Sequence, residues 1–281
     1  MKERPEETTP LPAPVVDSHC HLDVTDRHLG DTLDPVQALA LAREAGITRV
    51  VQVGCDVTSS QWAADFAAER DDVVAAVALH PNEVPRLVER GGQDALDEAL
   101  GVIETLAQRD DVRAVGETGL DYYRTREAAA QAVQHDSFRR HIDLAKRFDR
   151  TLVVHDRDAH DDILRILAEE GAPDRVVFHC FSGDAAMARY CADQGWWCSF
   201  AGVVTYKNAE DLREALRVLP RESILVETDA PYLTPVPHRG KVNASYLIPH
   251  TVRAMAEVRG ADVEQLCHDL WDNSHRAFGA F

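Results

Sequence analysis

The sequence has no long apolar run, no closely paired cysteines and a deficit of basic residues. Its longest unbroken apolar stretch, Val73 to Leu79, is far shorter than the roughly 20 residues of a membrane-spanning helix, so no transmembrane segment is predicted. Residues 1–14 lack the apolar core of a secretory signal and are predicted to form a flexible tail. The six cysteines include no C-x-x-C pair, which, without an export signal, favours reduced thiols and a cytoplasmic protein.

The charge balance limits the binding partners. The chain has 30 Lys and Arg against 48 Asp and Glu, a formal net charge of -18. Such a protein repels polyanions at long range, so a nucleic-acid function must depend on a local site rather than a broad basic surface. With 281 residues, 45% of them hydrophobic, the chain can bury a substantial core. We expect a single domain over residues 15–281.

Short β-branched runs recur along the chain with helical stretches between them. Runs of this kind are typical of parallel strands buried on both faces. Eight are found: Val15–His21, Arg49–Gly54, Val73–His80, Val112–Glu117, Thr151–His155, Arg175–Cys180, Trp196–Phe200 and Ser223–Asp229.

The segments between these runs carry apolar residues at helical spacing. The predicted helices are Pro35–Ala45, Gln61–Arg70, Asp94–Gln108, Arg126–Phe148, Asp158–Glu169, Ala185–Ala192 and Glu210–Leu219, with two more near Ser245–Arg259 and Asp262–Phe278. Eight βα units of about 30 residues predict an α/β fold of the (β/α)8 barrel type. The alternative is an open doubly wound sheet, which the absence of a G-x-G-x-x-G after any strand disfavours.

Polar side chains of the metal-ligating kind interrupt these hydrophobic runs. They are His19, His21, Glu117, His155, His179 and Asp229, and each lies at the C-terminal end of its predicted strand. Active sites of (β/α)8 barrels are built at that end. Buried carboxylates without partners are costly, and a divalent ion would supply a partner. The sequence therefore predicts a metal centre.

The number of ligands favours two ions over one. His19 and His21 project to the same side of a strand and can bind one ion together, with Asp17 one step deeper as a support for a histidine ring. Six ligands exceed the three or four protein ligands of a single zinc ion. Glu117 is expected to bridge, so that one ion has His19, His21, Glu117 and Asp229 and the other has Glu117, His155 and His179. Such a pair holds a hydroxide for hydrolysis.

Six motifs make the chain resemble the TatD family of metal-dependent deoxyribonucleases, in the amidohydrolase-like superfamily. They are DSHCHLD (17–23), VGETGLDYY (115–123), VVHDRDA (153–159), FHCFSG (178–183), ETDAPYL (227–233) and HRGKVN (238–243). The resemblance implies a distorted (β/α)8 barrel and metal-dependent cleavage of DNA, with 3′ exonuclease action in some members. It also implies the same six ligands. A role in DNA repair or turnover rests on the resemblance alone.

In the mechanism we expect, Asp229 accepts the proton of the attacking water while Glu117 holds the ions. Candidate substrate-binding residues are His80, Arg157, Arg239, Lys241 and Asn243. Arg157 could hold a phosphate or pair with a carboxylate, and His80 could contact substrate or cap its strand. Two loops depart from the family pattern, ALHPNE (78–83) and KVNAS (241–245), which affects substrate preference.

Several alternatives remain open on the sequence. The ions can be zinc, magnesium or manganese. The expected partner is DNA, as single strands or frayed 3′ ends, but the same centre could hydrolyse a small ester, amide or phosphodiester. A non-catalytic metal-binding protein is the third possibility, although all six ligands are present. The oligomeric state is not predicted.

Overall fold

The computed structural model describes residues 5, 8–24 and 33–279. Two compact units can be distinguished along the chain. Unit 1 comprises the described residues up to Gln52 and those from Cys180 onward, and unit 2 comprises Val53–His179. Among the described residues, none of the helices is both long and apolar enough to cross a membrane.

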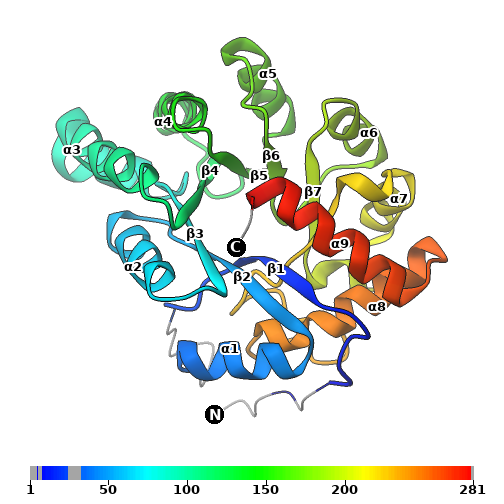
Figure 1. Ribbon diagram of the computed structural model, residues 1–281. Helices are drawn as coiled ribbons and strands as arrows, with labels where there is room; N and C mark the ends of the chain where they lie inside the picture. The colour runs from blue at the N-terminus through cyan, green and yellow to red at the C-terminus, as the bar shows by residue number, and fades with distance from the viewer. Residues whose placement is uncertain (1–4, 6–7, 25–32, 280–281) are drawn as a thin grey trace. The chain divides into compact units, whose positions relative to one another are not determined.

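All eight predicted strands are present, and helices alternate with them along the chain (Figure 1). The strands are β1 (Val15–Cys20), β2 (Ile47–Val53), β3 (Val73–Val77), β4 (Val112–Asp121), β5 (Thr151–Arg157), β6 (Val176–Phe178), β7 (Trp197–Phe200) and β8 (Ile224–Val226). Nearly all of their side chains are buried, on both faces of each strand. The β-branched composition of the runs follows from this two-sided burial.

The helices are α1 (Pro35–Glu44), α2 (Val57–Ala68), α3 (Val84–Ala107), α4 (Ala128–Arg147), α5 (His160–Glu170), α6 (Ala185–Asp193), α7 (Glu210–Val218), α8 (Ile248–Arg259) and α9 (Val263–Phe278). Three short 3-10 turns, η1 (Gly202–Thr205), η2 (Arg221–Ser223) and η3 (Ser245–Leu247), accompany them.

Two helices begin earlier than the sequence pattern predicted. Helix α2 starts at Val57 because the Asp56 carboxylate accepts the backbone N–H of Ser59, whose side chain in turn binds the backbone N–H of Asp56. This reciprocal capping box satisfies two donors at the helix start. Helix α3 starts at Val84 and is interrupted at Gly92, where φ is 70°. The predicted helix from Asp94 covered only the part after this glycine.

In unit 1, strand β1 has two neighbours. It pairs in parallel with β2, where Val15 faces Ile47, and its end bridges to Ala230 beyond β8. The backbone N–H of Asp229 donates to the carbonyl of His19 at 2.9 Å. Strand β7 pairs in parallel with β8. The segment after β8 is therefore attached to the end of β1.

The described part of the N-terminal tail is anchored, which corrects the prediction of a flexible segment through residue 14. Leu11 and Ala13 are buried, and the backbone N–H of Leu11 donates to Ala45 O at 3.0 Å. The guanidinium of Arg253 binds the carbonyls of Thr9 and Pro10. Residues 1–4 and 6–7, also assigned to the tail, lie outside the described residues.

Unit 2 contains four consecutive parallel strands, β3 to β6, paired in chain order. Within it, α2 packs against β3 and α4 against β4. Gly119 faces His155 in the register of β4 and β5. A Cβ atom on Gly119 would lie 2.1 Å from the carbonyl oxygen of His155, and its φ is +141°. Only glycine permits this approach. Gly119 therefore allows β4, the strand that carries Glu117, to lie close to His155 of β5.

Candidate metal centre

The first candidate cluster, which we call the H-x-H cluster, consists of His19, His21 and Asp229 in unit 1. His19 lies near the end of β1 and His21 follows it, so that both imidazoles point to one side. Their Nε2 atoms are 3.3 Å apart, and Oδ1 of Asp229 lies 3.4 Å from Nε2 of His21 and 3.8 Å from Nε2 of His19. Three possible donor atoms, all from residues proposed as ligands from the sequence, thus lie close to one another.

Asp17 supports this cluster in a different way from the one predicted. Its buried carboxylate does not hold a histidine ring. It accepts hydrogen bonds from the backbone N–H and the hydroxyl of Thr228, at 2.9 and 2.6 Å, and from the hydroxyl of Ser245 at 2.7 Å. Burial raises the pKa of Asp17 to about 6, although these hydrogen bonds act to lower it. Asp17 therefore joins β1 to the segment that carries Asp229.

Asp229 itself is placed by the backbone. Its φ is +54°, a left-handed conformation that Asp tolerates better than most residues. The amide of Asn243 donates to the carbonyls of Thr228 and Tyr232 at 2.9 and 2.6 Å, and so holds the turn on both sides of Asp229. Asn243 is buried. Its side chain thus stabilises the turn, a contact that the sequence did not predict.

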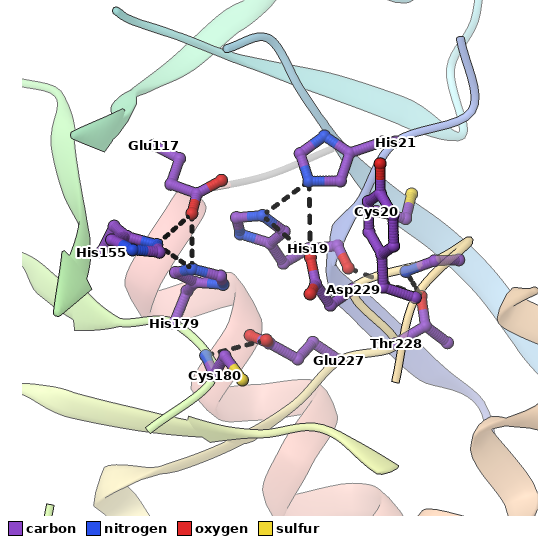
Figure 2. A network of polar contacts seen from close by, with 12 residues as sticks. His19, Cys20, His21, Glu117, His155, His179, Cys180, Glu227, Thr228 and Asp229 are labelled. Atoms are coloured by element: carbon purple, nitrogen blue, oxygen red, sulfur yellow. Dashed lines mark hydrogen bonds and ion pairs between the residues drawn. The ribbon is translucent and has the colours of Figure 1, made fainter. Parts of the chain in front are cut away.

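The second candidate cluster, the Glu117 cluster, consists of His80, Glu117, His155 and His179 in unit 2. One oxygen of Glu117, Oε1, lies 2.6 Å from Nδ1 of His155, 2.8 Å from Nε2 of His179 and 3.3 Å from Nε2 of His80. Figure 2 shows His155 and His179 pointing at this carboxylate. Glu117 is only 4% exposed, so its charge depends on these neighbours.

The electrostatics of the cluster favour an ionised carboxylate. Burial alone would raise the pKa of Glu117, but the charge of His179 and the hydrogen bonds from His155 and His179 hold that pKa well below its usual range. Burial would likewise lower the pKa of His155, yet hydrogen bonds to Asp121 and Glu117 raise it. A buried, ionised carboxylate among imidazole nitrogens has the donor set of zinc and other first-row divalent ions.

Asp121 supports His155 and was not identified from the sequence. Its Oδ2 lies 3.4 Å from Nε2 of His155 and accepts a hydrogen bond from the amide of Asn82 at 2.9 Å. Its other oxygen accepts the backbone N–H of Arg124. Carboxylates in this position orient metal-ligating histidines. The available signal was its spacing, because residues 117 and 121 project to the same face of β4.

His80 faces Glu117 as a hydrogen-bond donor. Its Nδ1 accepts the backbone N–H of Asn82 at 3.0 Å. Burial lowers the pKa of His80, which favours a neutral ring with its single hydrogen on Nε2. That nitrogen faces Oε1 of Glu117, and His80 also forms a candidate metal-binding group with Glu117 and His155.

Comparisons with known proteins identify the family. The family model described as TatD related DNase matches residues 16–279. The chain belongs to the TatD family. It is 45% identical over 268 residues to the uncharacterized metal-dependent hydrolase TatD of Mycobacterium tuberculosis, covering 94% of this chain and 98% of the relative. It is 40% identical to the metal-dependent hydrolase YcfH of Escherichia coli K12, covering 94% and 95%.

A solved TatD structure shares the fold. The crystal structure of YjjV, a TatD homologue of E. coli K12, matches with a TM-score of 0.83 at 25% identity and covers 94% of this chain and 97% of its own. These findings confirm the predicted family and the (β/α)8 barrel. As a TatD member the chain is a metal-dependent hydrolase, with candidate ligands in the two clusters.

The residues predicted to bind phosphate lie in two segments. Arg157 is in one, and Arg239 and Lys241 are in the other. Arg157 is exposed at the end of β5, and its guanidinium lies 4.0 Å from the ring centroid of Tyr123. Within the described part of the chain it forms no ion pair with a carboxylate, which was the alternative interpretation. Arg239 stacks on Tyr206 at 4.3 Å, and Lys241 lies in the same loop. Both arginines present a cation on an aromatic ring.

Proposed function

We propose that this TatD protein is a metal-dependent deoxyribonuclease that hydrolyses DNA phosphodiester bonds, acting as a 3′ to 5′ exonuclease on single strands or frayed ends. The observation that carries the proposal is the Glu117 cluster, in which one buried carboxylate oxygen is shared by imidazole nitrogens. The family model, described as TatD related DNase, supports DNA as the substrate.

The expected centre is dinuclear. Active sites of (β/α)8 barrels are built at the C-terminal ends of the strands, and His19 lies near the end of β1, whereas Glu117 lies in the second half of β4. We propose that two divalent ions would be held here, one by Glu117, His155 and His179, the other by His19, His21, Glu117 and Asp229. Two bound ions would lower the pKa of a water molecule and stabilise charge on a phosphate.

The residues of the chain then have separate tasks. The Asp229 carboxylate, which lies at the exposed side of the H-x-H cluster, takes the proton of the attacking water. With an ion held at Glu117, that carboxylate would no longer need the Nε2–H of His80, which would then donate to a non-bridging phosphate oxygen. Arg157, held flat on Tyr123, binds the adjacent phosphate through two N–H groups. Asn243 holds the turn around Asp229 and need not contact the substrate.

We expect the DNA-binding site to be small. With a net charge of -18, the protein repels DNA at long range, so a strand end suits it better than a long duplex. All six cysteines are free thiols, and we propose a cytoplasmic location on this basis.

The test is digestion of single-stranded and duplex DNA labelled at either end, with magnesium, manganese and zinc in turn. We expect metal-dependent shortening from the 3′ end, abolished by EDTA and by Asp229→Asn. Shortening from the 5′ end would contradict the proposed polarity. No cleavage by a fully metal-loaded protein would reject DNA as the substrate and favour a small ester, amide or phosphodiester.

A further inference from the structure

Cys55 lies at the edge of the Glu117 cluster and has no assigned role. It follows the end of β2 by two residues, and its side chain is half-buried. Its position is fixed by the backbone, because its N–H donates to the hydroxyl of Ser59 at 2.9 Å and its carbonyl accepts the N–H of His80 at 2.8 Å. The thiol is therefore held on the same segment of backbone as His80.

The thiol faces one oxygen of the Glu117 carboxylate. Sγ of Cys55 lies 3.7 Å from Oε2 of Glu117, and Oε1 of the same carboxylate lies close to His80, His155 and His179. The neighbours of Oε2 thus include a sulfur atom.

The distance between Sγ and Oε2 fits two ligands of one ion. With Zn–S of about 2.3 Å, Zn–O of about 2.1 Å and a tetrahedral angle, the two ligand atoms lie about 3.6 Å apart. The observed 3.7 Å needs almost no adjustment. As a hydrogen bond the same contact is long, and a thiol is a weak donor.

We propose that Cys55 supplies a sulfur ligand to the ion bound at Oε2 of Glu117 and thereby makes the centre selective for thiophilic ions such as zinc over magnesium and manganese. This inference rests on the proposed metal centre but not on DNA as the substrate. When the sulfur–metal bond forms, the thiol S–H bond breaks and its proton passes to solvent, with no change of oxidation state. Soft thiolate ligands select zinc, whereas carboxylate and water ligands alone suit magnesium and manganese.

The direct test is the absorption spectrum of the full-length protein loaded with cobalt(II). A cobalt–thiolate bond gives a charge-transfer band in the near ultraviolet that nitrogen and oxygen ligands do not give. We expect the band in the wild type, its loss in Cys55→Ser, and its retention in Cys191→Ser, a matched control whose thiol is buried in α6.

Zinc affinity gives a second readout that is independent of activity. Cys55→Ser should weaken zinc binding by at least about 10- to 100-fold, because that range already applies to the loss of a group that only supports a ligand. Manganese binding should change by no more than about two-fold, because manganese gains little from sulfur. Unchanged manganese binding also shows that the variant is folded.

The outcomes separate the two proposals. If the wild type binds cobalt without a sulfur band, or if the band disappears in Cys180→Ser and persists in Cys55→Ser, the role of Cys55 is rejected while the metal centre stands. If the wild type binds no ion at all, both the inference and the proposed function are overturned. Loss of the band and of zinc preference in Cys55→Ser alone would confirm the inference.

Discussion

His155 lies between two carboxylates, with Nδ1 at 2.6 Å from Oε1 of Glu117 and Nε2 at 3.4 Å from Oδ2 of Asp121. Asp121 is in turn held by the amide of Asn82 and the backbone N–H of Arg124. Asp121 thus fixes the orientation of the His155 imidazole at Nε2, while Nδ1 faces the buried carboxylate of Glu117. In this arrangement His155 is the candidate ligand, and Asp121 positions the His155 ring.

Asp121→Asn should weaken metal binding without disrupting the fold. Loss of the carboxylate frees the His155 ring and lowers its basicity, so metal affinity should fall by about 10- to 100-fold. Competition with a chelating dye measures the affinity. The matched control is Asp162→Asn in the same unit, whose carboxylate binds Tyr122 and Arg165. Equal affinities for both variants and the wild type would reject the positioning role of Asp121.

His80→Ala should lower turnover but leave the ions in place. Because Nδ1 of His80 accepts the backbone N–H of Asn82, its Nε2–H is free to act as a hydrogen-bond donor. Loss of one preorganised donor to a developing negative charge lowers kcat by about 100-fold or more. Metal content by mass spectrometry, measured on the same samples, decides the question. A missing ion in His80→Ala would show that His80 is a ligand.

Arg157→Ala should raise KM for DNA more than it lowers kcat. If the guanidinium over Tyr123 binds a phosphate outside the reacting group as proposed, a charged hydrogen bond of this kind contributes about 1.5 to 3 kcal/mol, or roughly 10- to 100-fold in KM. Steady-state kinetics on a short single strand measure the effect. Arg165→Ala, which removes a surface cation paired with Asp162 and Glu169, is the control. An unchanged KM would exclude Arg157 from the substrate site.

His141 should make the protein lose stability on acidification. Its buried Nε2 accepts the backbone N–H of Leu79 at 3.1 Å, and Nδ1 lies 2.8 Å from the carbonyl of Ser137. Burial lowers the pKa of His141 from 6.5 to about 4. The unfolded chain therefore binds more protons than the folded one between these values, and stability is lost as the pH falls from 6.5 toward 4.

The stability lost on acidification can be measured by comparing the wild type with His141→Gln. From pH 7 to pH 5, His141 should contribute a decrease of about 2 kcal/mol in the free energy of unfolding. His141→Gln should be less stable at pH 7 but should lack this part of the pH dependence. Urea denaturation at both pH values compares the two proteins. The same pH dependence in the variant would show that His141 is not the responsible group.

The strands were predictable, and the candidate metal ligands could be named, because both follow from local pattern. Parallel strands buried on both faces require β-branched runs such as those of β2 and β5, and a histidine or carboxylate that ends such a run stands out. In this fold, the end of the strand is also the place of the active site. His155, which closes the run TLVV, illustrates both points.

The supporting contacts were not predictable because they join residues distant in sequence. Asp121 contacts Asn82, 39 residues earlier. Cys55 contacts Glu117, 62 residues later. The anchoring of Thr9 by Arg253 spans 244 residues. A pattern read along the chain shows which side chains end a strand, but not which distant partner packs behind them.

The most direct test of the account is the number of ions bound by wild-type protein and by Glu117→Gln, counted by native mass spectrometry, together with cleavage of 3′-labelled DNA by the same samples. If Glu117 bridges two ions, the wild type holds two and cuts DNA, whereas Glu117→Gln loses at least one ion and nearly all turnover. Two ions and a normal rate in Glu117→Gln would contradict the central role assigned to this carboxylate.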